Sequence, residues 1–252
     1  MDTRRLVRRA AVIAALLALP SIALGASTVK GKVTGATKLL NPVWNDAKDP
    51  NAHRYSFREP SPTVRPDVRN LTAYLPKELC IVALAAEKGT ALKVPLRVVV
   101  SGGRTSPVTL VVAEGQQILF ENQDPFPHKL YEVTGKGGLT PTEMAPTKTR
   151  TWTPSGTGKF EIRDQAAPSI RSWIVVEPRA AGVGYPDRKG EFSLDVEPGF
   201  YKLRAYFAGE PVGQELDANV PGRGDVQLRT PLVVGEPDKP EGKDKDKKGD
   251  GK

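Results

Sequence analysis

Few residues of this chain can hold a transition metal. The 252 residues include two histidines, one cysteine and two methionines, and Met144 is the only methionine beyond the first residue. The histidines are His53 and His128, and the cysteine is Cys80. Two imidazoles, a thiolate and a thioether form the ligand set of blue copper sites. By count alone the chain has one such set, and the sequence around each residue decides whether it can assemble.

The sequence order argues against such an assembly. Cys80 lies in the apolar run LCIVALAA, where a buried and unreactive thiol is expected. His53 lies in a polar stretch without periodicity, and Met144 lies in the loop-like segment LTPTEMAPTK. We therefore expect none of the three to reach His128. Since Cys80 is the only cysteine, the chain has no internal disulfide.

The N-terminus has the pattern of an export signal. Residues 1–9 carry four arginines, and residues 10–25 form an apolar run that ends in small residues, so that cleavage before Ala26 is expected. The signal predicts an exported protein that is periplasmic, associated with the outer envelope or secreted. No integral membrane span is expected after cleavage of residues 1–25, and an uncleaved anchor is the alternative.

The remaining composition favours a turn-rich β protein. The chain has 24 glycines and 23 prolines, and strand-length segments rich in Val, Ile, Leu and aromatic residues recur between turn residues. The net charge is +8, but no basic block stands beside aromatic residues, so nucleic-acid binding is not expected. The sequence contains no nucleophile-elbow serine and no HExxH motif, so we expect no enzyme.

Two stretches depart from the strand pattern. Residues 36–70, within an N-terminal region 26–90, are rich in Pro, Asn, Asp and Arg and predict a long surface excursion. Trp44 and Tyr55 are its candidate contact residues. Residues 236–252 have balanced charge and no large apolar residue, which predicts a disordered tail.

The segment 111–176 resembles the cupredoxin (plastocyanin-like) family. VVAEGQQILFENQD is similar to a strand, turn and strand of that family, and His128 follows where the family has its first copper histidine. GKFEIRDQAAPSIRSWIVVEP is similar to the closing pair of strands, whose loop carries the other ligands. The resemblance implies a cupredoxin-like domain over residues 91–180.

The same resemblance implies a degenerate copper site. Aligned on the strand SWIVV, the family's Cys, His and Met positions fall on Asp164, Ala167 and Ile170. Only His128 is retained, so we expect no metal and no other cofactor, with copper as the alternative. We interpret residues 163–165 as a surface turn rather than as part of an acid–base pair.

A second resemblance covers the end of the chain. YPDRKGEFSLDVEPGFYKLRAYFAG is similar to the end of a carboxypeptidase-regulatory-like (transthyretin-like) β module, here residues 181–235, with two strands around a Pro-Gly turn. STVKGKVTG resembles the first strand of that module. Strands near Val29–Val33 and Leu71–Leu75 should therefore pair with segments after Gly190, which would make the cupredoxin-like unit an insertion.

Together these patterns predict an all-β protein: a cupredoxin-like Greek-key β-sandwich plus a smaller β-sandwich module, with a signal-peptide helix and a disordered C-terminal tail. The expected function is that of an exported, non-catalytic binding or scaffold protein of the periplasm or cell surface. Phe126 and His128, together with Trp44 and Tyr55, are the candidate contacts for an envelope or surface protein or polymer. A copper-binding electron-transfer protein is the alternative.

Overall fold

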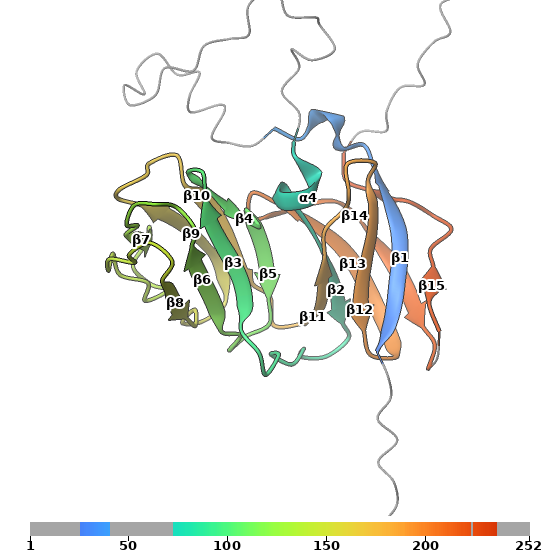
Figure 1. The fold of residues 1–252 in the computed structure, drawn as a ribbon. Helices are drawn as coiled ribbons and strands as arrows, with labels where there is room; N and C mark the ends of the chain where they lie inside the picture. The colour runs from blue at the N-terminus through green and yellow to red at the C-terminus, as the bar shows by residue number, and fades with distance from the viewer. Residues whose placement is uncertain (1–25, 41–72, 223, 236–252) are drawn as a thin grey trace, which may run out of the picture.

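The structure, a computed structural model, describes residues 26–40, 73–222 and 224–235 (Figure 1). Within these residues nearly all regular structure is β, as the sequence predicts, and the helical elements are η2 (Ala36–Lys38) and α4 (Leu75–Glu78). The predicted export signal at residues 1–25, the predicted tail at residues 236–252, and the candidates Trp44, His53 and Tyr55 lie outside the described residues.

The strands β3 to β10 form a sandwich that we call the inserted unit. One of its four-stranded sheets has the order β5-β10-β9-β7, and the other has the order β4-β3-β6-β8. The β5–β10 and β3–β6 pairs are parallel, and the other pairs are antiparallel. The strands are β3 (Leu96–Ser101), β4 (Arg104–Ser106), β5 (Thr109–Val112), β6 (Ile118–Asn122), β7 (Leu130–Glu132), β8 (Thr149–Trp152), β9 (Gly158–Asp164) and β10 (Arg171–Val176).

The strands on either side of this unit in the chain form a second sandwich, which we call the enclosing unit. One sheet has the order β12-β1-β15 with β16 also paired to β1, and the other has the order β11-β2-β13-β14. Its strands are β1 (Ser27–Thr34), β2 (Leu79–Ala85), β11 (Ala180–Gly184), β12 (Glu191–Val196), β13 (Gly199–Phe207), β14 (Glu210–Val220), β15 (Val226–Gln227) and β16 (Leu232–Val233). The pairing of β1 with β12 places Val29 opposite Leu194, as expected for a strand that pairs beyond Gly190.

One local prediction for the enclosing unit is wrong. The expected strand Leu71–Leu75 is not formed where the structure describes it, because Leu75 begins the helical turn α4 with Pro76 in its first turn. A proline is tolerated there, since the first N–H groups of a helix have no partner within it. The two strands expected around the Pro-Gly turn are formed as β12 and β13, and they belong to different sheets.

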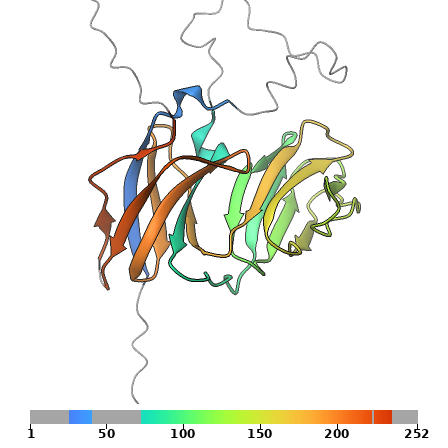
Figure 2. The ribbon, with the colours of Figure 1, turned by 180° about the vertical axis from the view of Figure 1, so that it is seen from behind.

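The two units share a buried boundary and lie side by side in both views (Figures 1 and 2). Strand β2 is buried on both faces. Leu79, Ile81 and Ala83 point into the core of the enclosing unit, and Cys80 and Val82 pack with Val111 and Val175 of the inserted unit. Alternate residues of β2 therefore pack into two different cores, which is why LCIVALA is a continuous apolar run.

Close contact between β11 and β12 needs glycine. A Cβ atom on Gly184 would lie 2.3 Å from the carbonyl oxygen of Ser193, and one on Gly182 would lie 2.6 Å from that of Asp195. Both distances are far below van der Waals contact. The GVG sequence of β11 therefore allows its backbone to lie directly against β12, which closes this side of the enclosing unit.

The ends of the strands define two ends of the molecule. Strand β3 follows the loop after β2, and β6, which ends at Asn122, runs parallel to it; we call the end that both strands reach the His128 end. The chain leaves the described fold after Leu40 and returns at Ala73, whose N–H donates to the Leu39 carbonyl at 3.1 Å. No helix among the described residues is long and apolar enough to cross a bilayer.

Candidate functional site

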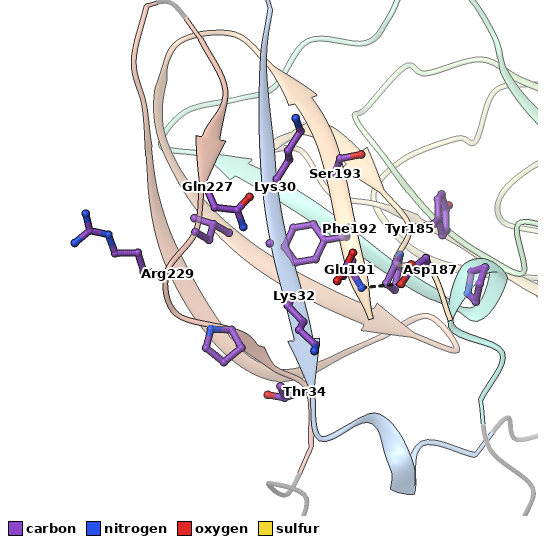
Figure 3. A pocket seen from close by; sticks show the side chains of 15 residues that line it. Lys30, Lys32, Thr34, Tyr185, Asp187, Glu191, Phe192, Ser193, Gln227 and Arg229 are labelled. Atoms are coloured by element: carbon purple, nitrogen blue, oxygen red, sulfur yellow. Dashed lines mark hydrogen bonds between the residues drawn. The ribbon is translucent and has the colours of Figure 1, made fainter. Parts of the chain in front are cut away.

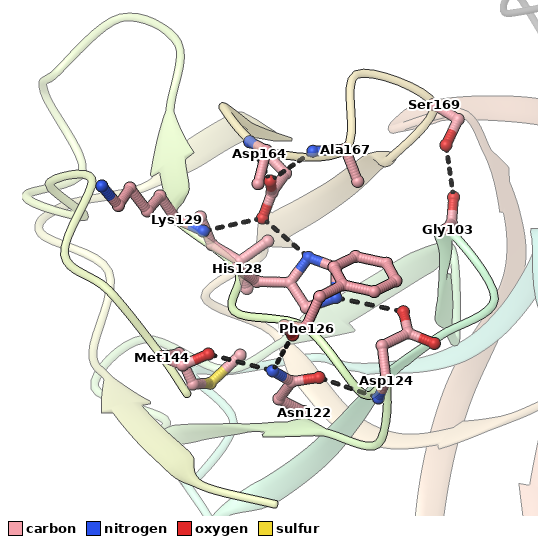
Figure 4. A network of polar contacts seen from close by, with 12 residues as sticks. Gly103, Asn122, Asp124, Phe126, His128, Lys129, Met144, Asp164, Ala167 and Ser169 are labelled. Carbon is pink, nitrogen blue, oxygen red and sulfur yellow. Dashed lines mark hydrogen bonds and ion pairs between the residues drawn. The ribbon is translucent and has the colours of Figure 1, made fainter. Parts of the chain in front are cut away.

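The candidate site lies in the loops that follow β6 and β9. Strand β6 ends at Asn122, and the chain then turns through Asp124 and Phe126 to His128, just before β7. Strand β9 ends at Asp164, and because β7 pairs with β9, Asp164 lies opposite Leu130. The pairing thus brings together residues 36 positions apart (Figure 4).

The imidazole of His128 bridges two carboxylates. Its Nδ1 lies 3.1 Å from Oδ2 of Asp164, and its Nε2 lies 3.0 Å from Oδ2 of Asp124. The His128 side chain is fully buried, and both carboxylates are nearly so. Both ring nitrogens therefore lie within hydrogen-bond distance of a carboxylate oxygen. We call this arrangement the Asp–His–Asp bridge.

Asp164 holds its place through backbone donors. Oδ2 also accepts from the Lys129 N–H at 2.9 Å, and Oδ1 accepts from the N–H groups of Ala166 and Ala167 at 2.5 and 2.7 Å. With His128 this makes four donors on one buried carboxylate. A carboxylate is the side chain that can accept from all four without offering a donor of its own.

Asp124 is the second anchor of the bridge. Burial alone would raise the pKa of its carboxyl, but hydrogen bonds from the Gly102 N–H and from His128 favour the charged form and lower the pKa below its usual value. The Gly102 N–H lies 2.7 Å from Oδ1. The carboxylate thereby ties the loop after β3 to the loop after β6.

The Asn122 side chain holds the loop after β6 through three hydrogen bonds. Its Oδ1 accepts from the Asp124 N–H at 2.8 Å, an Asx turn, and its Nδ2 donates to the carbonyls of Phe126 and Met144 at 2.9 Å each. His128 and Met144 also exchange two backbone hydrogen bonds, at 3.0 and 2.8 Å. The buried ring of His128 is thus positioned by side chains and backbone on several sides.

The structure corrects several expectations for these residues. His128 is buried, so its side chain is not a surface contact, whereas Phe126 is exposed and its ring lies 4.9 Å from the imidazole, centroid to centroid. Asp164 is buried rather than part of a surface turn, because its carboxylate serves the bridge. Met144 lies beside His128 through its backbone, although its place in the sequence suggested a distant loop. Ile170 packs in the core of the inserted unit, and Ala167 lies against it.

Two residues of the site were missed at the sequence level. Asn122 and Asp124 appear in the sequence as the Asn-x-Asp ending of a strand, and that spacing is itself a signal for an Asx turn. Their role as anchors for His128 depends on where the loops after β3 and β9 lie, which the local sequence does not encode.

The donor set does not fit copper. The two carboxylates lie against opposite nitrogens of the imidazole, so that they do not converge with a ring nitrogen on one point. Cys80 lies in the boundary between the units, packed with Val111 and Tyr206 rather than near His128. Among the described residues no three His, Cys, Asp or Glu side chains are grouped so as to hold a metal ion.

A separate hollow lies in the enclosing unit, beside β1 (Figure 3). Its volume is about 960 Å³, and it is open to solvent. The charged and amide side chains along it are Lys30, Lys32, Asp187, Glu191, Gln227 and Arg229. Lys30 is paired with Asp225 at 2.5 Å. Because the hollow is lined by both cations and carboxylates, its lining selects no single class of ligand.

No protein-family model and no curated protein matches the chain. Solved structures similar to it include a reduced mutant of amicyanin, with 19% identity over 38% of this chain and 98% of the amicyanin chain, at a TM-score of 0.31. A second reduced amicyanin mutant has 17% identity over 40% of this chain and 100% of its own, at a TM-score of 0.30. A purple cupredoxin from Nitrosopumilus maritimus has 14% identity over 32% of this chain and 99% of its own, at a TM-score of 0.29.

Proposed function

We propose that the protein is an exported, non-catalytic binding protein, whose inserted unit is a cupredoxin-like sandwich without copper ligands. The Asp–His–Asp bridge is the observation that carries the proposal. Both ring nitrogens of His128 lie against carboxylates, so neither nitrogen faces a position where a metal could bind. The bridge gives the loops a fixed arrangement by hydrogen bonds, where a metal would otherwise give it by coordination.

The binding surface is the loop layer that covers the bridge. Phe126 is 42% exposed between the exposed prolines Pro125 and Pro127, and its ring rests on the buried imidazole. An exposed aromatic ring on a rigid base is typical of an interface anchor, because little side-chain entropy is lost when it binds. The partner remains an envelope or surface protein or polymer, as the sequence suggests.

A metal titration tests the first part of this proposal. We expect no visible thiolate-to-copper absorption band, and no rise in melting temperature, when Cu(II) or Cu(I) is added to the purified protein. A band or a thermal shift that disappears in His128→Ala would instead support the electron-transfer alternative. A His128-independent shift would indicate adventitious copper and would leave the Asp–His–Asp bridge as the basis of the proposal.

Site-specific photo-crosslinking tests the second part. A photo-reactive phenylalanine analogue at position 126 should give a discrete adduct in the cell envelope. Val133 offers a matched control, because it is 44% exposed and lies in a different loop, after β7. Adducts of equal yield from positions 126 and 133, or none from either, would contradict a binding surface at Phe126.

A further inference from the structure

The three most exposed large apolar side chains are concentrated at one end of the molecule. Among the described residues, Leu92, Val94 and Phe200 are 54%, 66% and 76% exposed. The remaining exposed large apolar side chains, of Tyr74, Phe126 and Val133, are between 38% and 44% exposed. Leu92 and Val94 lie in the loop between β2 and β3, and Phe200 is the second residue of β13.

Strand pairing places these residues at the end opposite the His128 end. Strand β2 runs antiparallel to β13, so that its last residue, Ala85, lies opposite Tyr201, next to Phe200. The loop with Leu92 and Val94 then leads into β3, whose far end reaches Gly102 beneath Asp124. Figure 1 shows this loop and the start of β13 at the lower end of the ribbon.

The loop is held so that both side chains face outward. The Leu92 N–H donates to Oε1 of Gln116 at 2.7 Å, and Nε2 of Gln116 donates to the Val94 carbonyl at 3.0 Å. Gln116 itself is buried. The buried Gln116 amide thus fixes the backbone of the loop while the side chains of Leu92 and Val94 remain in solvent. Exposing these apolar side chains to water is unfavourable, and a partner surface that covers them would remove this cost.

The N-terminal segment joins the fold at this same end. Strand β1 begins at Ser27, opposite the last residue of β12, Val196, and three residues before β13 begins at Gly199. The Ser27 hydroxyl donates to the Pro221 carbonyl at 3.2 Å, which fixes the point of departure. Ala26, the first residue after the expected cleavage of the export signal, therefore lies at the end of the molecule that carries Phe200, Leu92 and Val94.

We propose that this end, defined by Leu92, Val94 and Phe200, lies against a lipid bilayer. The three side chains would insert into the interfacial region of the membrane across which the predicted export signal directs the chain, and this contact does not require residues 1–25 to stay attached. The His128 end, with Phe126, then faces away from the bilayer. The attraction is mainly apolar: Lys88 is paired with Glu114 at 2.6 Å, so the basic charge near the loop is partly neutralised.

Vesicle flotation tests the proposal without the apolar run. The chain from residue 26 to 252 contains every strand and every core cluster of the described fold. It should float with vesicles of phosphatidylethanolamine and phosphatidylglycerol, and Leu92→Ser and Phe200→Ser should each lower the partition coefficient about tenfold. Because the attraction is apolar, raising the salt concentration from low to physiological should change binding less than about threefold.

The control is Phe126→Ser, which removes an exposed aromatic side chain at the opposite end and should leave flotation unchanged. Circular dichroism and melting temperature confirm that each variant is folded. Failure of the unsubstituted chain to float, or equal flotation of folded Leu92→Ser and Phe200→Ser variants, would overturn the proposal. So would a dimer in solution that becomes a monomer in these two variants without any vesicle binding, since the surface would then join two copies of the chain. The copper and crosslinking tests concern the other end and are independent of this result.

Discussion

The substitution Asp164→Asn isolates the Asp–His–Asp bridge from everything around it. An asparagine has the same shape as Asp164 but only one acceptor oxygen, so it can keep either the Ala166 and Ala167 donors or the Lys129 and His128 donors, not both. Two of these donors, at least partly buried, then face an NH₂ group. A buried donor left without a partner costs about 1–3 kcal/mol, so the free energy of unfolding should fall by about 2–6 kcal/mol.

Urea or guanidinium denaturation of both proteins at pH 7 measures this change. The expected loss is a large part of the 5–15 kcal/mol or so that stabilises a typical domain, so the midpoint should move clearly. Asp217→Asn is the matched control, because the Asp217 side chain is 87% exposed and its nearest lysine lies 3.7 Å away. It should change stability by less than about 0.5 kcal/mol. A loss below about 1 kcal/mol for Asp164→Asn would refute the view that the bridge holds the loops together.

Three further predictions follow from individual contacts. The pKa of Asp124 is lowered in the folded protein, so its carboxylate stabilises the fold above its ordinary pKa, and this stabilisation is lost as the pH falls below about 4. The stability difference between wild type and Asp124→Asn should therefore shrink on acidification. Melting temperatures measured as a function of pH test this, and a constant difference would contradict it. Gly31→Val should destabilise by about 1–3 kcal/mol in denaturant unfolding, because a Cβ there would lie 2.7 Å from the Phe192 ring and 2.9 Å from Leu228; an unchanged midpoint would show that these side chains move aside. Burial raises the pKa of the Cys80 thiol to about 11, so a thiol reagent at pH 8 should label it only after unfolding, and rapid labelling of the folded protein would refute its burial.

The sequence predicted the β architecture because its signals are local. Strand β12 alternates buried and exposed residues along its length, and glycine or proline separates it from its neighbours. The partners of such strands are less accessible from sequence. Strands β12 and β13 follow one another with a tight connection, yet they join different sheets, because each has a stronger partner elsewhere: β1 for one and β2 for the other. Local turn chemistry permits a hairpin without requiring it.

The candidate site could be predicted only in part, for a similar reason. The position of His128 after a strand could be predicted from the sequence, but the hydrogen bonding of its ring depends on Asp164, which is 36 residues away. An aspartate among Arg, Gln and Ala resembles a surface turn, and nothing adjacent to it indicates burial. Its burial is stabilised by backbone N–H groups of its own loop and by the Lys129 N–H, and backbone donors leave no trace in the residue types.

The Asp–His–Asp bridge and the exposed ring of Phe126 are held in one rigid arrangement, and this rigidity affects how the loops can bind a partner. His128 is held on both nitrogens, and Phe126 packs on the imidazole while its carbonyl accepts from Asn122. A loop fixed in this way pays little entropy on binding, so it is suited to a partner that fits its existing shape. If the loops instead had to rearrange to bind, breaking the bridge would cost several kcal/mol, of the order expected for Asp164→Asn, and would weaken the complex by more than about a hundredfold. A rigid contact surface is therefore the use of this end that its hydrogen bonds favour.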